Sequence, residues 1–153
     1  METEFVQLGR VLLHAYARRD YHAVDRLAKN YLAAAENFRE SPNYGNAIHQ
    51  ANTLLGLMEL RHGRIDRATE YLLESARTPG SPQLKSLGPS MLLAESLLAA
   101  GQTNAVEEYL RDCRKLWRLS FGTLRRWRRQ ISRGRIPNFG ANRSYLIDYK
   151  SFG

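Results

Sequence analysis

Residues 46–77 read NAIHQANTLLGLMELRHGRIDRATEYLLESAR, and this stretch decides the fold. Its apolar and small residues recur at intervals of three and four on both sides of Gly63, a spacing typical of helices with one buried face. They are Ala47, Ile48, Ala51, Leu54, Leu55, Leu57, Met58 and Leu60 before the glycine, and Ile65, Ala68, Leu72 and Ala76 after it. The stretch therefore predicts two antiparallel helices that meet at Gly63.

A helix pair of the same kind is predicted in residues 4–39. Two apolar stripes with helical spacing lie there on either side of Arg18-Arg19-Asp20. The carboxylate of Asp20 is suited to capping the second of these helices, because it accepts hydrogen bonds from free backbone N–H groups.

Two Ser-Pro dipeptides, Ser41-Pro42 and Ser81-Pro82, stand 40 residues apart and indicate an internal repeat. Each precedes an apolar stretch that runs to a glycine, Gly63 or Gly101. Serine before proline is a favourable helix start, since the hydroxyl caps free N–H groups and proline at the first helical position lacks one.

A third helix pair is accordingly expected in residues 82–116. Gly88-Pro89 interrupts its first half and leaves two arrangements open. Either a short helix over residues 82–87 precedes a helix over residues 89–100, or one helix is kinked at this point.

Composition indicates one globular domain in a reducing compartment. The chain has 153 residues, 43% of them hydrophobic, and a single cysteine, Cys113, which has no partner for an internal disulfide. The N-terminal sequence METEFVQLGR starts with acidic residues and lacks the pattern of a signal peptide. No apolar run approaches the ~20 residues that cross a bilayer. We expect a cytoplasmic location and no membrane span.

Positive charge is concentrated at the C-terminal end. Residues 1–110 contain 11 Lys/Arg and 13 Asp/Glu, whereas residues 111–153 contain 12 and 2. Within the basic part, the spacing of Trp117, Phe121, Leu124 and Ile131, with Trp127 beside them, predicts an amphipathic helix over residues 117–131. The rest of its surface carries Arg118, Arg125, Arg126, Arg128, Arg129 and Arg133.

The last residues form a turn-rich segment that becomes aromatic and β-prone at Tyr145, Leu146, Ile147, Tyr149 and Phe152. The predicted fold is therefore all-α. Residues 1–116 form a helical-repeat domain of three stacked pairs, 4–39, 46–77 and 82–116. Residues 117–153 add a basic amphipathic capping helix and an irregular tail to the same domain.

The pattern over residues 47–117 resembles the tetratricopeptide repeat, with units of about 40 residues in place of 34. The resemblance is carried by Leu55-Gly56, Gly63, Ala68 and Leu72, and again by Leu93-Ala94, Gly101, Val106 and Leu110. It implies a right-handed stack whose first helices line a concave peptide-binding surface, in a family that does not consist of enzymes. Three further phrases, TPGSPQL (78–84), YLRDCRKLW (109–117) and GRIPNFGAN (134–142), are similar to small uncharacterised bacterial repeat proteins, which implies a bacterial protein.

Catalytic and metal-binding patterns are not apparent in the sequence. We find no nucleophile with a base, no paired carboxylates and no glycine-rich phosphate loop. The histidines, His14, His22, His49 and His62, never stand four apart on one helix, the spacing of zinc ligands. We expect no catalytic residue, no metal and no cofactor.

Two polar candidates stand close together on the first helix of the central pair. His49 and Asn52 would share a face and could present a polar pair to a ligand. The alternative, which we favour, is that His49 bridges the helix start near residues 41–46. Cys113 is interpreted as a small core residue, not as a reactive thiol.

An apolar concave face is implied by the resemblance, with Arg61 and Glu95 at its edges. Its residues would be Leu54, Leu57, Leu60, Met91, Leu92 and Leu98. An exposed patch of this kind requires a cover. We hypothesise that the chain supplies the cover itself, from the helix over residues 117–131 or the tail over residues 145–152.

The function expected from these features is a non-catalytic protein–protein adaptor that binds an acidic or amphipathic segment of another protein. Its expected contacts are Leu57, Arg61 and Glu95 in the groove, with Arg125, Arg126 and Arg129 as electrostatic anchors. The alternative is nucleic-acid binding, in which the arginines contact phosphates and Trp117, Phe121 and Trp127 stack on bases. The oligomeric state is left open.

Overall fold

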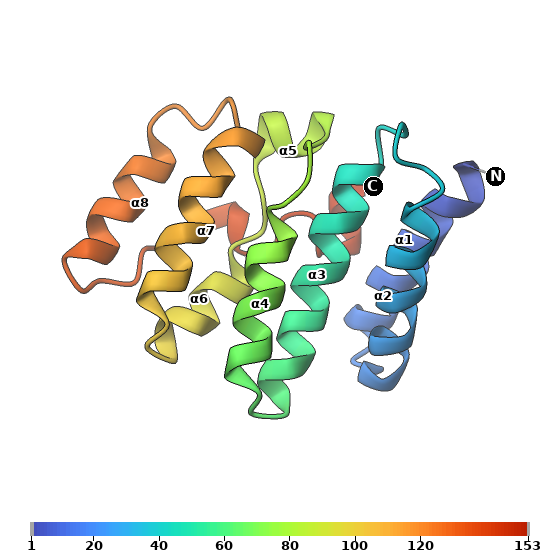
Figure 1. Cartoon of the computed structure of the whole chain (residues 1–153), viewed down its shortest axis with the longest axis horizontal. Helices are drawn as coiled ribbons and strands as arrows, with labels where there is room; N and C mark the ends of the chain where they lie inside the picture. The colour runs from blue at the N-terminus through green and yellow to red at the C-terminus, as the bar shows by residue number, and fades with distance from the viewer. Residues whose placement is uncertain (1, 153) are drawn as a thin grey trace.

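The computed structural model describes residues 2–152, with side chains through residue 150, and within that range it is all-α without a strand (Figure 1). The α-helices are α1 (Glu2–Ala17), α2 (Tyr21–Ala35), α3 (Tyr44–Arg61), α4 (Ile65–Ser75), α5 (Pro82–Leu87), α6 (Leu92–Ala99), α7 (Thr103–Leu116) and α8 (Thr123–Ser132). Two 3₁₀ turns follow, η1 (Gly140–Arg143) and η2 (Tyr149–Phe152).

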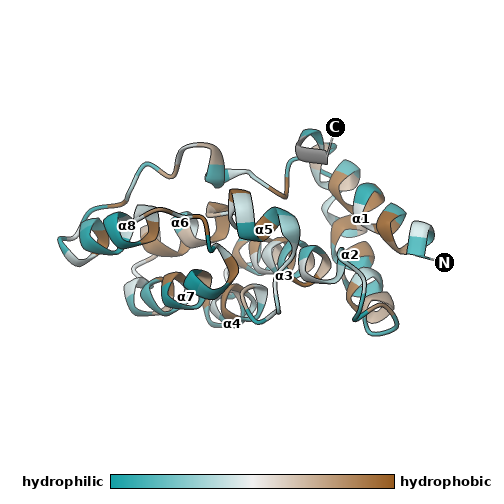
Figure 2. Ribbon diagram, turned by 90° about the horizontal axis from the view of Figure 1, so that it is seen from above, coloured by the Kyte–Doolittle hydropathy of each residue, from teal (hydrophilic) through white to brown (hydrophobic). Residues whose placement is uncertain are grey.

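The helices lie in two rows. Helices α1, α3, α6 and α8 form the first row, and α2, α4 and α7 form the second (Figure 2). Consecutive helices pack against each other from α1 to α4 and from α6 to α8, α4 also contacts both α6 and α7, and the short helix α5 contacts α3. Helix α8 packs on α7 and ends the arrangement on the side opposite α1.

Local signals set several helix boundaries as expected. Helix α3 ends at Arg61 and α4 begins at Ile65, with Gly63 between them at a φ of 73°, a conformation that glycine adopts without steric cost. Asp20 Oδ1 accepts a hydrogen bond from the Ala23 N–H at 3.3 Å and caps α2. These turns depend on residues close in sequence, so they could be predicted from it.

The third pair follows the first of the two arrangements that Gly88-Pro89 left open. Ser81 Oγ accepts a hydrogen bond from the Leu84 N–H at 3.0 Å and starts the short helix α5. Helix α6 begins at Leu92 and not at residue 89, and the Met91 N–H just before it donates to the carbonyl of Asn142 at 2.7 Å. The C-terminal part of the chain thus takes part in defining this helix start.

The helix predicted over residues 117–131 is interrupted, and that prediction is wrong in its first half. Helix α7 ends at Leu116 and α8 begins at Thr123. Phe121 and Gly122 between them have φ values of 50° and 85°, which a right-handed helix excludes. Phe121 is 88% exposed, although its spacing had placed it on the buried face. Trp117 is nevertheless buried, and its ring centroid lies 5.7 Å from that of Trp127.

The core consists of two clusters of buried side chains. One is built mainly from α1, α2 and α3, and the other from α4, α6, α7 and α8. Half-buried Leu57 of α3 packs against both clusters and connects them. Cys113 is fully buried in the second cluster, which confirms its interpretation as a core residue, and burial raises the pKa of its thiol.

Residues 134–152, called here the C-terminal segment, run from α8 back along the first row to α1 (Figures 1 and 2). The Arg143 guanidinium pairs with Glu95 of α6 at 2.9 Å, and Gln50 of α3 donates to the carbonyl of Leu146 at 2.8 Å. Ile147 is buried in the cluster of α1, α2 and α3. The segment therefore covers the first row, in agreement with the hypothesis that the tail supplies a cover.

The apolar face is closed within the described residues, since Leu54, Met91 and Leu98 are buried. One sequence prediction about the segment that covers it needs correction. The segment that was read as β-prone consists of turns and 3₁₀ helix, and the carbonyls of Arg143 and Leu146 accept hydrogen bonds from Ser90, in the link before α6, and from Gln50 of α3. The Phe152 side chain lies outside the described part.

Candidate interaction surface

The six residues expected to bind a partner do not form one surface. Glu95 is held by Arg143 of the C-terminal segment, and Leu57 is half buried between the two core clusters. The Arg61 guanidinium lies over the ring of Tyr21, 3.9 Å from its centroid. Arg125, Arg126 and Arg129 of α8 are exposed and make no contact of this kind. The three groove residues and the three arginines therefore lie on separate parts of the protein.

His49 is an internal bridge and not a surface ligand. Its ring is fully buried, Nε2 accepts a hydrogen bond from the Ser90 N–H at 2.9 Å, and Nδ1 lies 3.1 Å from the Ser75 carbonyl oxygen. The proton therefore belongs on Nδ1, which donates to Ser75. Burial lowers the pKa of His49 to about 4.

Both readings of His49 from sequence are thus corrected. The ring joins the end of α4 to the link before α6, and not the helix start near residues 41–46. Asn52 is also buried, and its amide donates to the Ile48 carbonyl one turn earlier at 2.8 Å. The pair is unavailable to a ligand because helices α4 and α6 enclose this side of α3.

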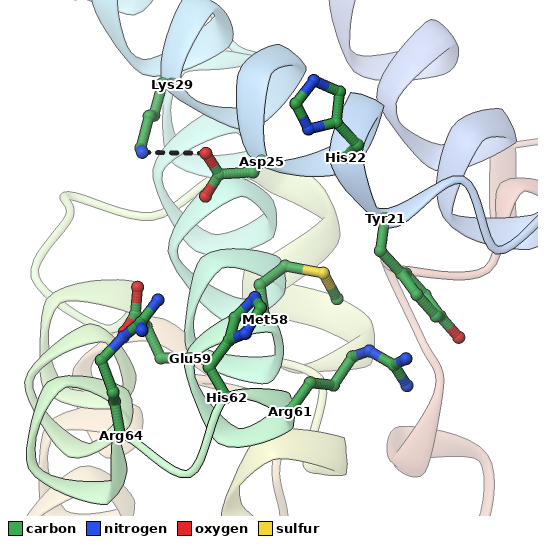
Figure 3. A pocket seen from close by; sticks show the side chains of 9 residues that line it. All are labelled: Tyr21, His22, Asp25, Lys29, Met58, Glu59, Arg61, His62 and Arg64. Carbon is green, nitrogen blue, oxygen red and sulfur yellow. Dashed lines mark hydrogen bonds and ion pairs between the residues drawn. The ribbon is translucent and has the colours of Figure 1, made fainter.

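A pocket of about 390 Å³ opens between α2 and the turn that joins α3 to α4 (Figure 3). Its lining residues are Tyr21, His22, Asp25, Lys29, Met58, Glu59, Arg61, His62 and Arg64. Most of the charged groups are already paired: Lys29 Nζ with Asp25 at 2.9 Å, and Arg64 Nε with Glu59 at 2.5 Å.

The same pocket lacks a recognisable reaction centre. Figure 3 shows His22 and His62 on opposite sides of it, and no hydrogen bond joins either ring to Asp25 or Glu59 in the described residues. No cluster of three or more metal-ligating side chains occurs in that part of the chain either.

Helix α8 presents a basic face on the exposed side of the second core cluster. Leu124, Trp127 and Ile131 are buried against the rest of the protein, whereas Arg125, Arg126, Arg129 and Arg133 are exposed. At about 100° per residue, these four arginines lie within about 100° of one another, opposite the buried side chains. The helix is amphipathic as predicted, and the arginines are on its solvent side.

None of these four guanidinium groups has an ion-pair partner within the described side chains. This distinguishes them from Arg39, Arg64 and Arg77, which pair with nearby glutamates. Unpaired guanidinium groups on one face retain all their donors for carboxylates or phosphates of another molecule.

The aromatic residues near this face divide into buried and exposed ones. Trp117 and Trp127 are buried, so neither ring is accessible for stacking on a nucleic-acid base. Phe121 is exposed at the tip of the loop that joins α7 to α8. Sequence periodicity placed this residue on a helix with the buried side chains, and the signal against that placement was the adjacent Gly122, which is typical of a turn.

The loop bearing Phe121 is fixed against helix α5. The Leu119 N–H donates to the Lys85 carbonyl at 3.1 Å, and Trp117 Nε1 donates to the Ser86 carbonyl at 3.3 Å. Leu87 of α5 and Leu119 of the loop are both partly exposed large apolar residues. We use the name basic end surface for Arg118, Arg125, Arg126, Arg129 and Arg133 together with Leu87, Leu119 and Phe121.

Comparisons with protein-family models, with curated proteins and with solved structures give no significant match. No helix among the described residues is both long enough and apolar enough to cross a membrane. The function is therefore inferred from the exposed residues themselves.

Proposed function

We propose that this protein is a non-catalytic interaction module that binds an acidic, amphipathic segment of another protein through the basic end surface. The observation that carries the proposal is the row of unpaired arginines on α8, together with the exposed phenylalanine of the loop that leads into this helix. Carboxylates of the partner pair with the arginines, and an apolar side chain of the partner covers Phe121.

We further propose a tetratricopeptide-like stack as the framework of this module, with α8 as its terminal cap. Support comes from the alternation of α1, α3 and α6 with α2, α4 and α7 in two rows. Gly56 adds support, because a Cβ at this position would overlap Leu93 of α6 and approach Tyr71 of α4. Such close helix approach at a small residue is the feature on which the resemblance depends.

This proposal moves the site away from the groove expected in such a family. The C-terminal segment already occupies the first-row face, through Arg143 on Glu95 and the Leu146 carbonyl on Gln50. A partner would have to displace these contacts to reach the groove. The basic end surface needs no rearrangement, which favours it as the docking site.

Nucleic-acid binding through the same arginines is the second candidate. It is supported by the unpaired guanidinium groups, which suit phosphates as well as carboxylates. It is weakened by the burial of Trp117 and Trp127, which leaves Phe121 as the exposed aromatic residue nearby. A surface that combines arginines with exposed aliphatic side chains suits a protein segment better than a nucleic acid.

The test is a titration of a fluorescent peptide built from leucine and glutamate in an amphipathic helical pattern. The variant Arg125→Glu/Arg126→Glu/Arg129→Glu should weaken binding at least tenfold, about 1.4 kcal/mol or more. The control Arg10→Glu/Arg18→Glu/Arg26→Glu changes the net charge equally at exposed sites of α1, α2 and their junction, and should have less than about a twofold effect.

A second variant tests the apolar part of the surface. Phe121→Asn removes the ring, and asparagine tolerates the positive φ of this position, so folding should be unaffected. We expect about tenfold weaker peptide binding. Equal binding by wild type and the arginine variant would refute the proposal. Tighter binding of random-sequence duplex DNA than of the peptide at one ionic strength would favour the second candidate.

A further inference from the structure

A second basic feature lies beside the loop that bears Phe121. A pocket of about 360 Å³ is bounded by Lys85 of α5, by Lys115 at the end of α7, and by Arg118 of the loop that follows. Buried Leu116 and the turn over residues 79–82 complete its lining. We call this the basic pocket. Three cations that come from three different elements thus border one concavity.

The charges of the basic pocket are uncompensated. Its lining contains no aspartate or glutamate, and none of its three cations forms an ion pair within the described side chains. The pocket between α2 and the turn that joins α3 to α4 differs in its charge balance, because Asp25 and Glu59 there pair with Lys29 and Arg64. An uncompensated cluster of like charges attracts an anion.

The walls of the basic pocket are held by hydrogen bonds. Ser81 Oγ donates to Asn46 Oδ1 at 2.6 Å and accepts from the Leu84 N–H at 3.0 Å. The bond from the Leu119 N–H to the Lys85 carbonyl joins α5 to the loop that carries Arg118. The backbone that carries the cations is therefore set before any ligand binds, and less ordering entropy is lost on binding.

We propose that the basic pocket binds a phosphate monoester on a serine or threonine of the partner segment; this inference rests on the function proposed above. A phosphate monoester carries a charge of about −1.5 to −2 and three acceptor oxygens, so it uses three cations more fully than a carboxylate does. Leu119 and Phe121 follow Arg118 in the same loop and contact the apolar residues of the same segment. Phosphorylation then strengthens docking.

The test compares two acidic amphipathic peptides that differ only in serine against phosphoserine. In the wild-type protein, phosphorylation should tighten binding about tenfold or more. In Lys85→Gln/Lys115→Gln this gain should fall to about twofold or less. The control Arg111→Gln/Arg114→Gln removes the same charge from exposed positions of α7 outside the pocket, and should keep the full gain.

The outcomes separate this inference from the proposed function. If both peptides bind equally to the wild type and binding still needs the α8 arginines, the inference is overturned and the function stands. If neither peptide binds, both fail. Inorganic phosphate should bind at least tenfold more weakly than the phosphopeptide; equal affinity would overturn the assignment to a phosphorylated partner. Displacement of the phosphopeptide by random-sequence DNA at equal phosphate concentration would overturn it in favour of a phosphodiester.

Discussion

Replacing Ile147 by alanine tests whether the C-terminal segment belongs to the core. Its side chain is 2% exposed and packs in the cluster formed by α1, α2 and α3. Truncation of a buried isoleucine to alanine removes apolar contacts and leaves a cavity, at a cost of about 3 kcal/mol. For a chain of this length, that loss corresponds to a fall in melting temperature of about 10 °C.

The matched control is Ile136→Ala in the same segment. Ile136 is 52% exposed, so its truncation should cost about 0.5 kcal/mol or less. Both variants are measured by thermal melting and by urea denaturation followed by circular dichroism. The urea midpoint should fall for Ile147→Ala with an unchanged slope, since the surface exposed on unfolding remains nearly the same.

Equal stability of the two variants would refute the packing described for this segment. Residues 134–152 would then be a tail that leaves the first-row face open, and the groove would return as a candidate site. A loss of stability in Ile147→Ala but not in Ile136→Ala would show that the C-terminal segment unfolds together with the core.

Three further predictions concern stability. Gly45→Ala should destabilise the protein by more than about 2 kcal/mol, measured by urea denaturation, because the added Cβ would overlap the Gly80 carbonyl. Burial depresses the pKa of His49 to about 4, whereas the unfolded chain has a histidine pKa of about 6.5. The free energy of unfolding should therefore be highest above pH ~6.5 and should fall by about 3 kcal/mol as the pH is lowered to about 4, because the unfolded chain takes up a proton that the buried ring does not. In His49→Gln, thermal melting at about pH 7 and about pH 4 should show a smaller loss of stability than the wild type, since this contribution is absent. Glu95→Gln should cost less than about 1 kcal/mol in the same assay, since its pair with Arg143 is partly exposed and screened by water.

Features that depend on neighbouring residues could be predicted from the sequence. The helical spacing on both sides of Gly63 gives α3 and α4 with their turn, and the carboxylate of Asp20 gives the start of α2. The arginine face of α8 follows from the same periodicity, because Leu124 and Ile131 fix the buried side. Each of these depends on interactions within about one helical turn.

Features that depend on distant residues could not be predicted. Trp117 has the spacing of a helical residue, yet it reaches the core from a loop, where it contacts Trp127 and donates to Ser86. The two partners of His49 lie 26 and 41 residues away in sequence. Periodicity carries no information about such contacts, so it cannot tell a buried histidine bridge from a surface ligand.

The same limit applies to the candidate site. The sequence identifies the cations, but whether they form ion pairs with carboxylates of the same chain is determined by the tertiary structure. Glu95 illustrates the point: it was expected at the edge of a groove, and Arg143, 48 residues later in the sequence, forms an ion pair with it. The expected groove residues and the arginines of α8 consequently fall on separate surfaces.

The most direct test of the central claim is hydrogen–deuterium exchange of the whole protein with and without the acidic amphipathic peptide. Docking on the basic end surface should slow exchange in the loop after α7 and in α8, and leave α3 and α6 unchanged. Slower exchange in α3 and α6, or faster exchange in the C-terminal segment as it is displaced, would contradict the claim and place the partner in the groove.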